Sequence, residues 1–142
     1  MSTARMINGG CECGAVRFTV SGPLRKVVYC HCKQCQRLSG LYVAATACAM
    51  EDLELTSDNS LQWYASSDVA SRGFCRTCGS NLFYRPEHGR HMSIMAGTLD
   101  APSGLNAAMH VYIEEADNYY TVNDGLPQKH GMPDDIWVDN DA

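Results

Sequence analysis

The sequence predicts a mainly β fold, a single domain of short antiparallel strands with one or two short helices. The chain has 142 residues, which is the size of one ordinary domain with a hydrophobic core of its own. Short runs of apolar or alternating side chains follow one another, and turn residues separate them. This pattern is typical of chains that fold into many short strands.

The expected elements follow in chain order. A glycine-rich turn at 9–14 allows positive φ angles. Residues 33–38 contain no glycine or proline and predict one or two helical turns, which Ser39 and Gly40 end. The run 41–50 (LYVAATACAM) is apolar and partly β-branched, which predicts a buried strand. Alternation or short apolar runs predict the others, and the full set of strands spans residues 15–20, 26–30, 41–50, 53–56, 61–64, 81–85, 91–96, 109–113 and 119–122.

Charge and composition indicate which kinds of partner and which cellular compartment to expect. The net charge is −5, and no basic face is evident, so we expect no nucleic-acid partner and no anionic membrane surface. No apolar run approaches the roughly 20 residues that span a bilayer, and residues 1–6 lack the apolar core of a signal peptide. We therefore expect a cytoplasmic protein. In a reducing compartment, clustered cysteines indicate metal ligands or catalysts and not disulfides.

Four of the eight cysteines form two close pairs, Cys11 with Cys13 and Cys75 with Cys78. The second pair has the C-x-x-C-G pattern of a zinc knuckle, whose tight turn points backbone N–H groups at the sulfur atoms. The first pair has one intervening residue, so on a strand both thiols would project from one face. Four thiolates complete a tetrahedral zinc site, and closed sites of this kind are structural.

Three further cysteines, Cys30, Cys32 and Cys35, lie within six residues of one another. They leave one corner of a zinc tetrahedron free, and an open site can do chemistry. Three thiolates donate electron density to zinc, which makes the ion a poor activator of hydrolytic water. The same site is suited to capture a fourth sulfur and hold it as a thiolate near neutral pH. The pattern therefore predicts an enzyme or a binding protein whose partner is a small thiol.

A closed site is the alternative for this trio, with His31, His110 or Cys48 as the fourth ligand. His31 lies between two ligands and would point away from them on an extended backbone, so it is the weakest of these candidates. Cys48 lies inside an apolar run, where a buried core thiol is the simplest interpretation.

An anionic thiol would need a cationic partner beside an anionic zinc centre. Lys33 and Arg37 lie near the trio in the sequence, and Arg72, Arg76 and Arg85 lie near the second cysteine pair. We expect most of these side chains to be solvated charges. Arg37, on the helix that follows the ligands, is the best candidate for binding the thiol.

We find no repeat, linker or low-complexity segment. A metal ion held between cysteine pairs that flank the middle of the chain would tie its two halves together. We therefore expect one zinc-binding domain over residues 1–142, with a core over about 7–127 and an irregular, acidic tail over 128–142.

Together these motifs resemble the glutathione-dependent formaldehyde-activating enzyme family. The resemblance covers residues 9–127 in matching order and spacing. The matching segments are 10–14 (GCECG), 30–36 (CHCKQCQ), 39–40 (SG), 74–80 (FCRTCGS), 97–100 (GTLD), His110 and 124–127 (DGLP).

The resemblance implies a zinc-bearing β-tent-like fold with two zinc ions per chain. It implies a structural zinc on Cys11, Cys13, Cys75 and Cys78, and a catalytic zinc on Cys30, Cys32 and Cys35. The characteristic family reaction joins glutathione and formaldehyde into S-(hydroxymethyl)glutathione and is classed in reverse as a carbon–sulfur lyase. Glutathione would then be the co-substrate, and the partners would be a small-molecule thiol and an aldehyde. The sequence does not indicate an oligomeric state.

Two other functions remain open at the level of sequence. The first is a non-catalytic zinc-binding interaction module of the same fold. The second is a redox or metal-buffering protein, which would release zinc readily on mild oxidation.

Overall fold

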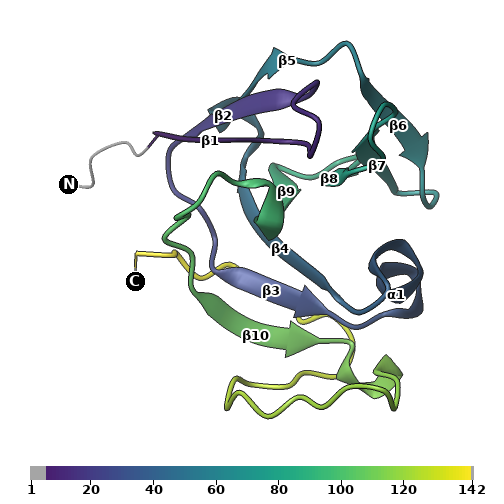
Figure 1. Ribbon diagram of the computed structural model, residues 1–142. Helices are drawn as coiled ribbons and strands as arrows, with labels where there is room; N and C mark the ends of the chain where they lie inside the picture. The colour runs from purple at the N-terminus through teal and green to yellow at the C-terminus, as the bar shows by residue number, and fades with distance from the viewer. Residues whose placement is uncertain (1–5, 142) are drawn as a thin grey trace.

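The computed structural model describes residues 6–141, and Figure 1 shows their arrangement. Within this range the chain forms a 3-stranded sheet, in the order β1-β2-β5, and a 7-stranded sheet, in the order β10-β3-β4-β9-β8-β7-β6. The strands are β1 (Met6–Gly10), β2 (Arg17–Ser21), β3 (Val27–Cys30), β4 (Val43–Ala49), β5 (Leu53–Ser57), β6 (Leu61–Ala65), β7 (Ala70–Cys75), β8 (Asn81–Pro86), β9 (His91–Met95) and β10 (Ala107–Val111). The helical segments are α1 (Lys33–Ser39) and the 3-10 turns η1 (Met50–Asp52), η2 (Ala96–Thr98) and η3 (Ile113–Glu115). The predicted mainly β fold is confirmed.

Most expected strands are present with their ends shifted by one or two residues, as is usual for predicted boundaries. The prediction did not include β1 and β7. The strand predicted at 119–122 is wrong, because this segment lies in a turn and an irregular stretch. Its tyrosines use their hydroxyl groups to hold the turn: Tyr119 donates to the Gly40 carbonyl at 3.0 Å, and the Tyr120 hydroxyl lies 2.8 Å from His31 Nδ1.

The pairing of β10 with β3 determines what surrounds the three-cysteine stretch. Neighbouring strands are antiparallel except for this pair, which is parallel and needs a long crossover connection. The register places His110 opposite Tyr29 and Val111 opposite Cys30. In Figure 1, β3 leads directly into α1, and β10 lies along its outer edge. The late part of the chain therefore reaches the stretch that carries Cys30, Cys32 and Cys35.

The main hydrophobic core lies between the two sheets. Val16, Phe18 and Val20 contribute from β2 and the turn before it, and Phe83 and Ile94 contribute from the larger sheet. All five are at most 1% exposed. The rings of Phe18 and Phe83 meet edge to face at 5.2 Å between centroids. A smaller cluster of buried residues, Cys35, Val43 and Met95, forms where α1, the start of β4 and the end of β9 meet.

We expect Gly9→Ala to lower the free energy of unfolding by about 1–3 kcal/mol, the usual range for overpacking. A Cβ at Gly9 would lie 2.5 Å from Phe18 Cζ and 2.5 Å from the Thr98 carbonyl oxygen. The carbonyl oxygen belongs to the backbone, so relieving this contact would require the chain itself to shift. Gly97→Ala is the control, because a Cβ there meets nothing within 4 Å. Urea unfolding followed by circular dichroism measures both. Similar losses in the two variants would contradict this account.

The end of the chain packs back onto the link between β2 and β3. Residues 128–141 contain isolated bridges but no helix or longer strand. Lys26 N–H donates to the Val138 carbonyl at 2.7 Å, and Asn140 N–H donates to the Leu24 carbonyl at 2.9 Å. Residues 1–5, part of the segment expected to lack a signal peptide, lie outside the described range. Among residues 6–141, no helix has the length and apolar character that crossing a bilayer requires.

Candidate metal centres and the adjoining cavity

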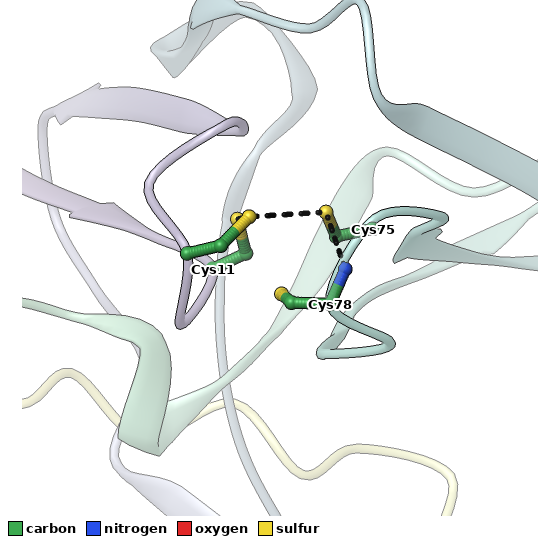
Figure 2. A group of neighbouring side chains, drawn as sticks. Cys11, Cys75 and Cys78 are labelled. Carbon is green, nitrogen blue, oxygen red and sulfur yellow. Dashed lines mark hydrogen bonds between the residues drawn. The ribbon is translucent and has the colours of Figure 1, made fainter.

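The first cysteine cluster joins the turn after β1 to the end of β7 and the turn that follows it. The sulfur atoms of Cys11, Cys13, Cys75 and Cys78 all lie within 4.8 Å of one another, so the group could hold a metal ion. Figure 2 shows Cys11 facing Cys75 and Cys78. The Sγ–Sγ distances are 3.6 Å from Cys11 to Cys13 and 3.8 Å from Cys13 to Cys75. Four sulfurs about 2.3 Å from a central zinc ion would be about 3.8 Å apart, so this donor set fits zinc.

Cys11 and Cys13 lie in the glycine-rich turn predicted from the sequence, and the strand geometry considered for their spacing is wrong. Gly14 closes the turn with a φ of 84°, and its N–H donates to the Cys11 carbonyl at 3.2 Å. Backbone N–H groups also point at the sulfurs. Val16 N–H donates to Cys11 Sγ at 3.2 Å, and Cys78 N–H donates to Cys75 Sγ at 3.5 Å. Such donors stabilise negative charge on the sulfurs and orient them.

The second cluster forms where β3 ends and α1 begins. Cys30 is the last residue of β3, Cys32 is the N-cap of α1, and Cys35 lies in its first turn. Their sulfur atoms lie within 4.8 Å of one another and could hold a metal ion. Cys32 Sγ accepts the Cys35 N–H at 3.4 Å, which is the contact of a capping side chain. Hydrogen bonding from Cys30 lowers the pKa of Cys32 and, in return, raises the pKa of Cys30, so the cluster favours a thiolate at Cys32.

No fourth protein ligand completes this trio among residues 6–141, where no histidine, cysteine or acidic side chain joins the three sulfurs within 4.8 Å. His31 and His110 face each other, with 2.8 Å between Nε2 and Nδ1. Cys48 lies in the main core with no exposed surface, and burial raises its pKa to about 12. The three side chains considered as closing ligands are therefore engaged elsewhere.

His31 and His110 belong to a chain of four hydrogen-bonded side chains. His110 Nε2 lies 2.8 Å from Asp124 Oδ2, and a carboxylate only accepts, so this nitrogen carries the proton. His110 Nδ1 then accepts from His31 Nε2–H, and His31 Nδ1 accepts from the Tyr120 hydroxyl. Burial lowers the pKa of His31, which favours this neutral ring. The chain holds the imidazole of His31 in place, and with it the backbone that carries the two flanking thiols.

We expect Tyr120→Phe to lower the free energy of unfolding by about 1–3 kcal/mol, because it leaves the buried His31 Nδ1 without a donor. Tyr119→Phe is the matched control. Tyr119 is 61% exposed and donates to Gly40, so its loss should stay within about 0.5 kcal/mol. Chemical denaturation of both variants measures the difference. A Tyr119 variant as unstable as the Tyr120 variant would refute the role of the buried chain.

The three-cysteine cluster lies in the wall of a cavity of about 680 Å³. Two arginines, Arg25 and Arg72, also line it, together with the polar side chains of Lys33, Gln34 and Glu115. Residues of the C-terminal tail contribute Met132 and Ile136. The apolar part of the wall is formed mainly by Val28, Val43, Ala45, Met95, Val111 and Ile136.

The cationic residues of the cavity differ from the one expected. Arg37 lies on the exposed side of α1 and is not among the lining residues. Arg25 and Arg72 line the cavity and are 6% and 4% exposed. The sequence of β7 could have indicated that Arg72 points inward, because Arg72 lies two residues from the buried Ala70 and so shares its face of the strand. Arg25 lies in the link between β2 and β3, where no local pattern indicates which side chain points inward.

Comparison with known proteins gives both a family and a fold. A family model described as glutathione-dependent formaldehyde-activating enzyme matches residues 6–115. A protein of Schizosaccharomyces pombe named as an uncharacterized lyase is 28% identical over 83 residues, which are 58% of this chain and 60% of that protein. The alignment thus spans about 60% of the length of this relative.

A solved structure adds support for the fold alone. A crystal structure of a Rhodobacter sphaeroides protein superimposes with a TM-score of 0.57 at 23% identity, and the match covers 86% of this chain and 98% of that one. The family model, in contrast, covers most of the chain and includes all seven cysteines of the two clusters. On this match, the chain belongs to the glutathione-dependent formaldehyde-activating enzyme family.

Proposed function

We propose that this protein is a zinc-dependent carbon–sulfur lyase of the S-(hydroxymethyl)glutathione synthase type, which joins a small thiol to an aldehyde and reverses the same step. The observation that carries the proposal is the three-sulfur cluster in the cavity wall, to which residues 6–141 add no fourth ligand. The family description makes glutathione and formaldehyde the first candidates for the thiol and the aldehyde. The name of the yeast relative, a lyase, agrees with this class of reaction.

The reaction needs a nucleophilic sulfur and no redox partner. Zinc bound by Cys30, Cys32 and Cys35 would act as a Lewis acid that keeps the sulfur of a bound thiol as a thiolate. A sulfur lone pair forms the bond to the aldehyde carbon, the π bond of the carbonyl breaks, and its electrons go to oxygen. The proton lost by the thiol ends on that oxygen. RSH and R′CHO thus give RS–CH(OH)R′, and the reverse step returns both.

Arg72 lies where a centre of three thiolates needs a positive charge. Its Nη2 is 3.9 Å from Cys35 Sγ and donates to Gln34 Oε1 at 3.0 Å, and the guanidinium lies 4.9 Å from the centre of the Tyr84 ring. Its Nε is buried without a hydrogen-bond partner, and no carboxylate in residues 6–141 forms an ion pair with it. Burying an uncompensated cation is costly, so an anionic centre at this place supports the assignment.

We assign the four-cysteine cluster a structural zinc ion, because four sulfurs leave no position open for a substrate. It would hold the turn after β1 against the end of β7 and so join the two sheets. Both clusters need reduced cysteines, which is consistent with a cytoplasmic location.

The test is a panel of thiols and aldehydes followed by NMR for formation of the C–S adduct, with zinc content measured on the same samples. We expect close to two zinc ions per chain, adduct formation, and easier loss to a chelator of the zinc on the three-cysteine cluster. The proposal would be refuted if the metal at this cluster does not bind added thiols, or if no pair in the panel forms an adduct.

A further inference from the structure

Arg25 is a buried cation in the cavity wall that no acidic side chain balances. It is 6% exposed, and no carboxylate in the described part of the chain forms an ion pair with it. Its Nε donates to the Lys26 carbonyl at 3.2 Å, and its Nη2 donates to the Ala45 carbonyl at 2.8 Å. Burial lowers its pKa to about 10, which still leaves the guanidinium charged at neutral pH. A buried charge held only by carbonyl dipoles is expensive, and it indicates that an anion completes the site.

The charges of the two buried arginines of the cavity are balanced by different anions. Arg72 has the Cys35 sulfur within 3.9 Å, so the three-thiolate cluster accounts for its charge. The hydrogen bonds of Arg25 go to backbone carbonyls and not to a sulfur. The anion that Arg25 lacks is therefore not part of the described protein, and the cavity is the space from which a ligand would supply it.

The rest of the cavity wall limits the chemical character of the ligand that carries this anion. Apolar side chains from Val28, Val43, Ala45, Met95, Val111 and Ile136 form one part of the lining, and Lys33, Gln34, Arg72 and Glu115 contribute a polar part. Amide or ammonium groups placed against the apolar part would lose their hydrogen bonds to water without replacement. Glu115, whose Oε1 accepts the Lys33 N–H at 2.9 Å, adds a carboxylate to the lining. A second anionic group near it would be repelled.

We propose that the thiol substrate is a compact mercapto acid, whose carboxylate binds Arg25, whose apolar body lies along this wall, and whose sulfur reaches the cluster of Cys30, Cys32 and Cys35. The thiol end of this inference rests on the proposed function. Arg25 is then the residue that determines specificity, because a guanidinium pairs with a carboxylate through two parallel hydrogen bonds. Glutathione carries two carboxylates, an ammonium and two amides, to which the apolar part of the lining offers no hydrogen bonds.

Isothermal titration calorimetry on the zinc-loaded protein tests this assignment. The ligands are ω-mercaptoalkanoates with two to five methylene groups, the methyl ester of each, and glutathione. We expect the best-fitting acid to bind at least about tenfold more tightly than its ester, the size expected for hydrogen bonds to a charged group. Arg25→Gln should bring this ratio close to one by weakening the acid alone. Arg37→Gln is the matched control and should leave the ratio unchanged, because Arg37 lies outside the cavity lining.

The outcomes separate this inference from the proposed function. Equal affinities of acid and ester for the wild-type protein would overturn the role of Arg25 and leave the proposed function standing. Absence of binding by every thiol, esters included, would overturn both. Glutathione binding more tightly than every mercaptoalkanoate would overturn the inference that the thiol substrate has an apolar body. If Arg25→Gln does not fold, Arg25→Lys decides: it keeps the charge without the planar fork, and an acid-to-ester ratio as high as in the wild type would refute bidentate binding.

Discussion

Replacing Cys75 by serine is expected to lower the free energy of unfolding by more than about 4 kcal/mol, a large part of the total stability of an ordinary domain. Cys75 ends β7 and lies next to the sulfurs of the turn after β1, so the four-cysteine cluster connects the two sheets. Serine keeps an acceptor for the Cys78 N–H that now reaches Cys75 Sγ, so the loss reports on the metal ligand. Urea unfolding followed by circular dichroism, with zinc content measured in parallel, gives the result.

Cys48→Ala is the control for removing a cysteine outside both clusters. Cys48 is fully buried in the main core, so we expect a loss of about 1–3 kcal/mol with both zinc ions retained. A Cys75→Ser protein that retains two zinc ions, or that is no less stable than Cys48→Ala, would contradict the structural role of the four-cysteine cluster.

Replacing Cys32 by serine is expected to reduce thiol binding and C–S adduct formation by more than about 100-fold, which is the size of losing an essential ligand of a metal site. The zinc content should fall by one ion per chain. The fold should survive, because Cys32 is the N-cap of α1 and serine is a favoured residue at that position. NMR of the adduct, metal analysis and the melting temperature together measure these effects.

The comparison of Cys32→Ser with Cys75→Ser also decides between the functions left open by the sequence. An equal loss of stability in both variants would favour a non-catalytic zinc module, in which both metals hold the fold. Ready release of zinc from the wild-type protein after mild treatment with peroxide would favour a redox or metal-buffering role. A stable Cys32→Ser protein without thiol binding supports the enzyme.

Much of the candidate metal sites could be predicted from the sequence, because the members of the three-cysteine cluster and of each cysteine pair are close neighbours in the chain. Cys30, Cys32 and Cys35 lie within six residues, and a strand end followed by one helical turn brings their sulfurs together. Cys75 and Cys78 lie on one tight turn for the same reason. For Cys11 and Cys13 the glycine-rich segment predicted the turn that is observed, and the strand geometry suggested by their spacing is wrong. The alternation of apolar side chains likewise predicted most strands and failed at 119–122, where Tyr119 and Tyr120 bond to other parts of the chain.

From the amino-acid sequence alone one can predict the three-cysteine cluster, the two close cysteine pairs and the class of fold, because each follows from side chains that are near one another along the chain. Tertiary folding brings the two cysteine pairs together and determines what surrounds the open cluster. The parallel pairing of β10 with β3 brings His110 to His31, and the folding of the larger sheet brings Arg25 and Arg72 into one cavity while Arg37 stays outside. These contacts join residues far apart in the chain, and strand order and register set them, which no local pattern of residues specifies.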